Sequence, residues 1–369
     1  MAAVRHEGEA VWFRAPGRVN LMGDHTDYNA GFVLPAAVDL ECVIAVRSRE
    51  DRRVTVRSLD VGETEAVVDV AADGTDAPRT VEPPWGRYVA GVVRALAEAG
   101  RAAAGMDAVL SSTVPSGSGL SSSAALEVSL ALALCHEASF ELPLTELAHA
   151  CQHGEQIATG VPSGIMDQVV SLAGEAGAAL LLDCRSLEYE TVQLAPSIAV
   201  LAVHSGLSRT LAGSAYAERR AATEAAAARL GLRSLRDATL EQVADDPLAR
   251  HVVSENARVL EVAAAIRTGD LDGLGELYAA SHASLRDDFR VSTPELDALV
   301  RILVEEGALG ARLTGAGFGG CVVALARPED AAAIADRAGR RYREETGRES
   351  RTFLCRLAAG AGRIPAPPR

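Results

Sequence analysis

A glycine- and serine-rich stretch, "VPSGSGLSSSAALEVS" at residues 114–129, has the composition of an anion-binding site. Gly117 and Gly119 allow the backbone to approach a ligand closely. The serines at 121–123 come where an apolar helix begins, beside its unpaired N–H groups and the positive end of its dipole. The pattern predicts a phosphate site, with a flexible loop carrying a serine N-cap as the structural alternative.

Carboxylates and other polar groups are crowded into a second stretch, "LMGDHTDYN" at residues 21–29. Asp24, His25, Asp27 and Tyr28 lie there between two apolar runs. Carboxylates are strong acceptors for ligand hydroxyl groups. A polar turn capped by its own Asp and Asn side chains is the structural alternative.

The stretch "GVPSGIMDQVVS" at residues 160–171 contains a third possible site. Pro162 and Gly164 favour a turn, after which Asp167 would fall near the start of a helix. A carboxylate in that place could be an N-cap and nothing more. Taken alone, this motif is a weak signal.

A last glycine cluster, "LTGAGFGGCVVALA" at residues 313–326, formally contains GxGxxG at Gly315, Gly317 and Gly320. The dinucleotide fingerprint follows a strand and opens a helix, whereas these glycines lead into a β-branched run. The sequence therefore predicts a turn, which also includes Gly319, against which another element or a ligand packs. A purely structural turn stays possible.

The chain contains no lysine, so all 36 of its basic residues are arginine. A Walker A loop, a protein kinase and a pyridoxal enzyme each need a lysine, and all three are excluded. Any anion must therefore be bound by arginine, backbone N–H groups, helix termini or a metal.

His149 and His153 have the i, i+4 spacing of two metal ligands on a helix. The glutamate of the HExxH motif is missing, because Ala150 stands in its place. We interpret this face as a solvated or partly packed helix surface, with zinc as the minor alternative.

Strands dominate the first third of the chain, whereas long helices dominate after Gly213. Because the two kinds of element segregate, the predicted class is α+β with two lobes and a boundary near residue 195, giving lobes 1–195 and 196–369. The first strands are expected at 10–16, 41–48, 52–59 and 63–70, followed by a helix from Trp85 to about Ala99. The later helices are expected at 214–230, 249–267 and 271–288, before a helix–strand–helix–strand ending.

The composition excludes several classes of partner. The net charge is −14, which argues against nucleic acid because phosphate binding needs a basic face. Six scattered cysteines without a CxxC pair suggest neither a disulfide framework nor a zinc ribbon. Without a bilayer-length apolar run or a signal peptide, we expect a cytoplasmic protein with no membrane partner.

In order and spacing, the motifs together resemble the GHMP small-molecule kinases, and among them the galactokinases. The resemblance rests on the motifs "GRVNLMGDHTDYNAGFVLP", "GLSSSAALE" and "TGAGFGGC", with Gly315, Gly317 and Gly319 in the third of them. The pieces "WGRYVAGV", "EQIATGVPSGIMDQ" and "AYAERR" agree as well. The resemblance extends from about Phe13 to Leu357.

The resemblance implies a two-lobed GHMP kinase fold, with a β-rich N-terminal lobe and a ferredoxin-like C-terminal lobe. It implies an ATP-dependent kinase acting on the anomeric hydroxyl of a sugar, with galactose as the first expectation. Ser123 and Glu155 resemble the residues that hold Mg²⁺. The expected ATP-binding residues are Trp85, Tyr88, Gly117, Ser118, Gly119, Leu120, Ser121, Ser122 and Ser123.

By the same resemblance, Arg18 and Asp167 form the catalytic pair. Phosphoryl transfer needs positioning and charge neutralisation, and the permanently charged Arg18 could stabilise both the attacking oxygen and the phosphoryl group. Asp167 would be either a general base or an orienting group. The expected sugar-binding residues are Asp24, His25, Asp27, Gly164 and Tyr216.

Two positions depart from the galactokinase pattern. Asp24 stands where the signature ordinarily has glutamate, which shortens the side chain by about 1.5 Å. His204 replaces an acid in "VHSGLSRT". A relative acting on L-arabinose, N-acetylgalactosamine or galacturonate is therefore an alternative, although the two aspartates would repel galacturonate.

Two rival functions are weaker. A non-catalytic sugar and ATP sensor would not need to retain Arg18, Ser123, Glu155 and Asp167 together. A mevalonate-type substrate would make no use of the polar "HTDYN" segment. The sequence does not distinguish a monomer from a dimer.

Overall fold

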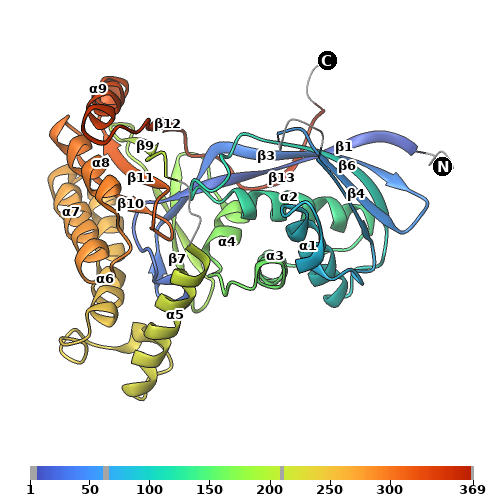
Figure 1. The fold of residues 1–369 in the computed structure, drawn as a ribbon, viewed down its shortest axis with the longest axis horizontal. Helices are drawn as coiled ribbons and strands as arrows, with labels where there is room; N and C mark the ends of the chain where they lie inside the picture. The colour runs from blue at the N-terminus through green and yellow to red at the C-terminus, as the bar shows by residue number, and fades with distance from the viewer. Residues whose placement is uncertain (1–5, 61–65, 208–211, 367–369) are drawn as a thin grey trace.

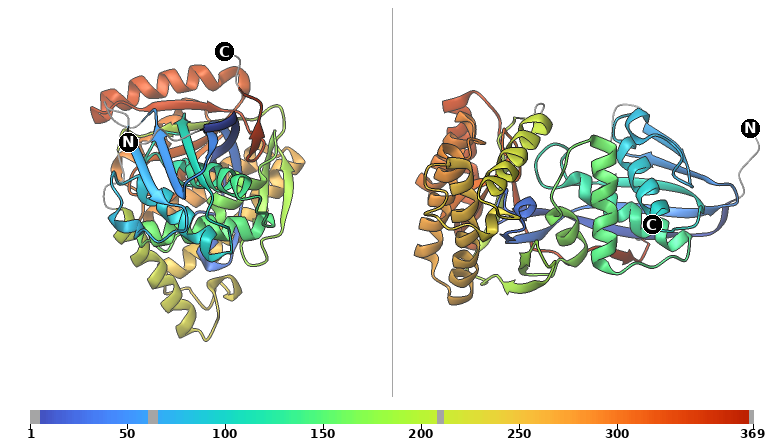
Figure 2. Two further views of the ribbon diagram at one scale, coloured as in Figure 1. Left: turned by 90° about the vertical axis from the view of Figure 1, so that its right-hand side faces the viewer. Right: turned by 90° about the horizontal axis from the view of Figure 1, so that it is seen from below.

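The computed structural model describes residues 6–60, 66–207 and 212–366. Within these ranges the chain forms two regions along the long axis of the molecule (Figure 1). One region carries a large sheet covered by helices α1–α4, and the other carries helices α5–α9 beside a smaller sheet (Figure 2).

The large sheet has the strand order β13-β1-β3-β6-β4-β5. Its neighbouring strands are antiparallel, apart from the parallel pair β4 and β6. β13 comes from the end of the chain and pairs with β1, far away in sequence (Figure 1). The strands are β1 His6–Asn20, β3 Pro35–Arg49, β4 Arg53–Ser58, β5 Ala66–Ala71, β6 Gly105–Ser112 and β13 Gly362–Ile364.

Helices α1–α4 form a layer in which α3 packs on the other three, while α1, α2 and α4 also contact strands of this sheet. Helix α2 is apolar on nearly all sides, because it contacts β1 and β3 as well as helices α1, α3 and α4. The helices are α1 Gly86–Glu98, α2 Ser122–Glu137, α3 Leu144–Thr159 and α4 Met166–Ala173. A three-stranded sheet lies nearby, formed by β2 Phe32–Val33, β7 Ala178–Asp183 and β8 Tyr189–Gln193.

The smaller sheet has the order β10-β11-β9-β12 and is antiparallel. Its strands are β9 Ala199–His204, β10 Gly310–Thr314, β11 Cys321–Ala326 and β12 Arg351–Cys355. The helices beside it are α5 Ala212–Arg229, α6 Pro247–Thr268, α7 Leu271–Asp287, α8 Pro294–Glu305 and α9 Pro328–Thr346. A separate apolar core joins this sheet to helices that include α8 and α9.

Most elements fall where the sequence predicts them. The predicted turn at residues 313–326 is confirmed, because its glycines connect β10 to β11 as an antiparallel hairpin. β10 itself was not expected, and β1 extends beyond its expected end to include Arg18. The predicted boundary near residue 195 falls between β8 and β9.

Across the described ranges, none of the helices combines the length and apolar character needed to span a membrane.

Candidate active site

Arg18 lies at an irregularity of β1, against the glycine–serine loop. The pairing of β1 with β3 changes register between Pro16 and Arg18. Gly17 lies so close to the loop that a Cβ there would come within 2.5 Å of the Leu120 carbonyl oxygen. The N–H of Arg18 donates to that carbonyl over 3.0 Å, and Nη1 donates to the Gly119 carbonyl. The loop therefore fixes the position of the Arg18 guanidinium.

Asp167 meets Arg18 from the first turn of α4, although 149 residues separate the two in sequence. Nε of Arg18 donates to Oδ1 over 2.8 Å, and Nη2 donates to Oδ2 over 2.7 Å. Such a bidentate contact sets the carboxylate against the guanidinium edge and restricts the orientation of both groups. The Asp167 side chain keeps 27% of its exposure, so the pair stays accessible.

A small cavity of about 300 Å³ opens beside this pair. It brings together all seven residues expected to bind the sugar or to catalyse the reaction. The small cavity is lined by Arg18, Asp24, His25, Asp27, Tyr88, Glu155, Thr159, Val161, Ser163, Gly164, Met166, Asp167, Tyr216, Gly315 and Ala316.

Gly164 leaves room for the side chain of Asp27. A Cβ at Gly164 would lie only 1.6 Å from Oδ2 of Asp27, so a larger residue there would displace the carboxylate. Burial, and with it the charges of Asp167 and Asp24, raises the pKa of Asp27 to about 6. The carboxylate is therefore poorly solvated and close to other carboxylates, so a donor from a ligand would stabilise its charged form.

Aromatic rings pack together around this part of the small cavity. The ring of His25 lies 5.7 Å from that of Tyr216 and 4.6 Å from that of Phe289. Nδ1 of His25 is 2.9 Å from the hydroxyl of Tyr28. Together these contacts orient the imidazole. The backbone of His25 is left-handed, with φ of 67°.

Asp24 lines the small cavity, but its carboxylate is held by protein groups. Oδ1 accepts the N–H of Gly315 over 2.9 Å and the side-chain amide of Asn20 over 3.2 Å. Oδ2 accepts Nη2 of Arg312, a side chain with no exposed surface. Both oxygens of Asp24 therefore already have donors.

Glu255, on α6, completes this buried cluster. Its Oε1 lies 3.3 Å from Nη2 of Arg312 and accepts the N–H of Gly23 over 3.2 Å. Burial alone would raise the pKa of Glu255, but the charges of Arg312 and Arg258 outweigh it and lower the pKa to about 2. The cluster therefore ties the polar turn after β1 to α6 and β10.

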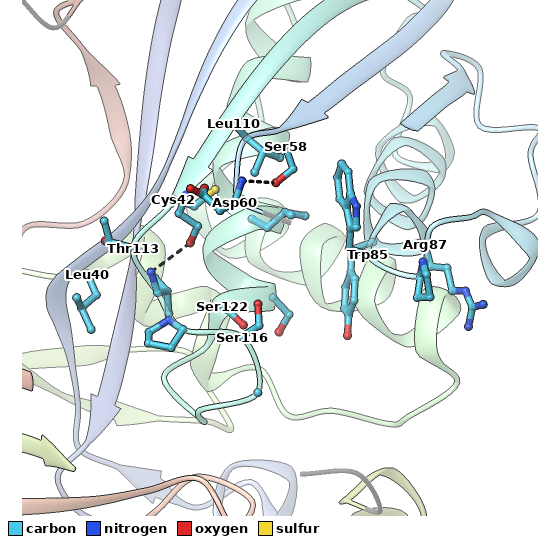
Figure 3. Close-up of a pocket in the computed structure, with 18 of the residues that line it drawn as sticks. Leu40, Cys42, Ser58, Asp60, Trp85, Arg87, Leu110, Thr113, Ser116 and Ser122 are labelled. Carbon is cyan, nitrogen blue, oxygen red and sulfur yellow. Dashed lines mark hydrogen bonds between the residues drawn. The ribbon is translucent and has the colours of Figure 1, made fainter. Parts of the chain in front are cut away.

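A large cavity of about 940 Å³ lies next to the small one, and Figure 3 shows its lining. Trp85 stands on one side of this large cavity and Ser58 and Asp60 on the other, with Ser116 and Ser122 between them (Figure 3). Five of the residues expected to bind ATP line it: Trp85, Tyr88, Gly117, Ser122 and Ser123.

The indole Nε1–H of Trp85 is buried and has no hydrogen-bond partner in the described part of the chain. An unpaired buried donor is costly, so a ligand acceptor would be favourable near it.

The other residues expected at ATP, from Ser118 to Ser121, are not among the residues that line the large cavity. The hydroxyl of Ser118 donates to the carbonyl of Pro115 over 2.7 Å and accepts the N–H of Leu120 over 3.2 Å. Leu120 is buried in the core, and Gly119 contacts Arg18 as described above. These residues shape the loop from within.

Ser123 and Glu155 meet at the junction of the two cavities. The hydroxyl of Ser123 donates to Oε1 of Glu155 over 3.0 Å. Gln168 donates to the second oxygen of Glu155 over 3.2 Å and to Oε2 of Glu127 over 2.9 Å. Burial raises the pKa of Glu127 well above its usual value, and Oε1 of this residue lacks a partner in the described ranges.

The last glycine cluster, at residues 313–326, contacts both the small cavity and other segments of its own lobe. Gly315 lines the small cavity and binds Asp24 through its N–H. A Cβ at Gly317 would meet the Val291 carbonyl oxygen at 2.4 Å, and one at Gly319 would meet that of Leu207 at 3.1 Å. Gly315 alone of these three glycines lines either cavity.

The histidine pair of α3 shows no metal site. His153 Nε2 lies 3.0 Å from Oε2 of Glu98, and both side chains are about half exposed. No group of three or more His, Cys, Asp or Glu side chains in the described ranges could hold a metal. His204 ends β9 and accepts the N–H of Gly206 over 3.1 Å, while residues 208–210 of its divergent segment lie outside the described residues.

Sequence reasoning missed Arg312, Glu255 and Gln168. Arg312 directly precedes the last glycine cluster, and Glu255 interrupts the apolar face of a helix. A charge within an apolar pattern was the signal that could have found both. Gln168 gave no signal apart from standing next to Asp167.

Three family models match the chain. Residues 3–48 match the galactokinase galactose-binding signature. Residues 87–175 match the N-terminal domain of the GHMP kinases, and residues 262–344 match their C-terminal model.

Solved structures show the same fold. The galactokinase of Lactococcus lactis, solved with galactose, has a TM-score of 0.90 and 34% identity, covering 96% of this chain and 95% of that one. The mevalonate kinase of Methanococcus jannaschii, at 18% identity, has a TM-score of 0.70 and covers 95% and 99%, which is a likeness of fold alone. These matches confirm the predicted GHMP kinase fold.

A curated relative extends the likeness over nearly the whole sequence. The galactokinase of Roseiflexus sp. (strain RS-1) is 43% identical, over 96% of this chain and 93% of its own. Together with the matching signature, this identity shows that the chain belongs to the galactokinase family of the GHMP kinases.

Proposed function

We propose that this chain transfers the γ-phosphoryl group of ATP to the anomeric hydroxyl of galactose, giving galactose 1-phosphate. The observation that carries the proposal is the junction of the two cavities. Ser123 lines the large cavity, Glu155 lines the small one, and their side chains are hydrogen-bonded. ATP in the large cavity would bring its terminal phosphate to the small cavity, where Arg18 and Asp167 lie.

The roles of the catalytic pair follow from this geometry. The anomeric hydroxyl would give its proton to Oδ1 of Asp167, which accepts one hydrogen bond within the described ranges, from Arg18. Its oxygen would form the new bond to phosphorus while the bond to the ADP oxygen breaks. Arg18 would stabilise the charge of the transferring group, because its guanidinium remains ionised throughout.

We infer that Mg²⁺ completes the site. A serine hydroxyl and a carboxylate are hard oxygen ligands, and Mg²⁺ usually takes the rest from phosphates and water. Burial, and with it the charge of Asp167, raises the pKa of Glu155, so a nearby cation would stabilise its ionised form. When bound, the ion would neutralise phosphate charge during transfer.

Recognition of the sugar is assigned to the small cavity. Asp27, with its raised pKa, would accept ring hydroxyls, and Gly164 leaves the space for its carboxylate. His25 and Tyr216 would pack against the sugar. Galactose is the first candidate for the substrate, because the Lactococcus galactokinase was solved with it and the matching signature is described as galactose-binding.

A galactose-like sugar other than galactose is the second candidate. It is favoured by Asp24, whose two oxygens already accept donors from Asn20, Gly315 and Arg312. A carboxylate so occupied would contribute less to selecting one end of the sugar. L-Arabinose and N-acetylgalactosamine are therefore included in the test, together with galacturonate.

The test is an ADP-release assay with ATP and Mg²⁺. We expect the highest kcat/KM with galactose, lower values with L-arabinose and N-acetylgalactosamine, and none with mevalonate. Turnover on mevalonate alone would overturn the proposal, and sugar binding without ADP release would support a sensor. Omission of Mg²⁺ should abolish turnover.

The location of the protein in the cytoplasm remains a prediction from the sequence.

A further inference from the structure

Ser121 has a backbone that is rare for its residue type. It stands immediately before α2 with φ of 62° and ψ of 48°, the left-handed region, and its side chain makes no capping hydrogen bond. Residues other than glycine and asparagine seldom adopt this conformation, and it persists where neighbouring contacts impose it. A serine at this place would ordinarily cap the helix.

Its hydroxyl instead contacts the catalytic pair. Oγ of Ser121 donates to Oδ2 of Asp167, the same oxygen that accepts Nη2 of Arg18 over 2.7 Å. Ser121 is 7% exposed and is not among the residues that line the large cavity. The next two residues, Ser122 and Ser123, do line it.

We propose that Ser121 is a positioning residue for Asp167 and not a ligand of the ATP phosphates. Arg18 contacts both carboxylate oxygens, which still allows the carboxylate to tilt against the guanidinium plane. A third donor on Oδ2 limits that tilt and leaves Oδ1 for the attacking hydroxyl. The left-handed backbone turns the Ser121 hydroxyl from the start of the helix to Asp167.

The inference rests on the proposed function, since it assigns a part to Ser121 in orienting Asp167. It also divides the three adjacent serines. Ser122 and Ser123 would contact the nucleotide or its metal, whereas Ser121 would contact the residue that receives the proton. The same short loop would therefore contact both the phosphoryl donor and the residue that accepts the proton.

Ser121→Ala and Ser122→Ala form a matched pair for the test. We expect Ser121→Ala to lower kcat about tenfold or more, with KM for ATP within about twofold of the original, because the lost hydrogen bond is to a charged group. Ser122→Ala should raise KM for ATP several-fold and change kcat less. A raised KM for ATP in Ser121→Ala with kcat unchanged would overturn the inference, as would equal effects of the two substitutions.

Ser121→Gly separates the hydroxyl from the backbone. Glycine adopts a φ of 62° without strain, so this variant should fold even where Ser121→Ala does not. It should show the same loss of kcat, and full activity would contradict the inference. The loss should also vanish in the background of Asp167→Asn, since the two side chains act as a unit. Normal turnover in Asp167→Asn alone would instead contradict the proposed function.

Discussion

Two arginine–aspartate pairs lie near the end of β1, and they differ in exposure. In the pair of Arg18 and Asp167, the side chains are 6% and 27% exposed, and both residues line the small cavity. In the pair of Arg312 and Asp24, the values are 0% and 2%. The first pair is open to a ligand on one side, whereas the second is enclosed by protein.

The difference separates chemistry from architecture. Arg312 donates to Asp24, to Glu255, to the hydroxyl of Ser281 and to two backbone carbonyls. A buried charge with this many partners cannot exchange them during a reaction without a large desolvation cost. Arg18 keeps one accessible partner, so it can act on a substrate. Residue type alone does not distinguish these roles.

The largest effect is expected from Asp167→Asn. This substitution keeps the shape of the side chain but removes the proton acceptor, so kcat should fall by at least about a thousandfold. Galactose affinity, measured by calorimetry, should stay within about tenfold, because the other cavity residues are unchanged. Turnover close to that of the original protein would remove Asp167 from the mechanism.

Arg312→Met tests the buried pair. Removal of the guanidinium leaves Asp24 buried without its cation and Glu255 with Arg258 alone, and breaking such a buried pair costs about 3–5 kcal/mol. We expect the free energy of unfolding, measured with urea, to fall by that amount.

Arg18→Met is the matched control for this measurement. Asp167 keeps contact with water, so the loss of stability should be no more than about 1 kcal/mol, while activity is lost. If both variants were destabilised equally, exposure would not distinguish the two pairs.

The two pairs also show what the sequence could predict. Most strands and helices follow from hydrophobic periodicity, and the motifs indicate Arg18 and Asp167 through a family resemblance. No local pattern shows that residues 149 positions apart are in contact. Arg312 was missed because β10, the strand that carries it into the interior, was itself not expected from the sequence. The contact of the Ser121 hydroxyl with Asp167 joins residues 46 positions apart and is therefore a tertiary property.

Asp24→Glu should have a smaller effect. The longer side chain must fit into a site that is already filled, and overpacking costs about 1–3 kcal/mol. We expect lower stability in urea, with kcat/KM for galactose within about tenfold. Asp24→Asn is the control, because it keeps the volume and leaves Glu255 to neutralise Arg312. Higher stability of Asp24→Glu would mean that Asp24 is not the enclosed partner of Arg312.

The smallest effect concerns Asp27 and pH. Because burial raises its pKa from 3.8 to about 6, folding favours the protonated form, and the stabilising contribution of this form is lost as the pH rises from about 4 to 6. At pH 7 the free protein therefore carries a costly buried charge.

Asp27→Asn should then raise the Tm of the sugar-free protein by a few degrees at pH 7, with a difference that shrinks toward pH 5. The exposed Glu50 provides the control, since Glu50→Gln should leave the Tm within about a degree at each pH. Galactose should raise the Tm of the original protein but not that of Asp27→Asn, because the acceptor for its hydroxyls is lost. A Tm that falls in Asp27→Asn at pH 7 would show that this carboxylate stabilises the free protein, as the enclosed pair does, and does not belong with the open one.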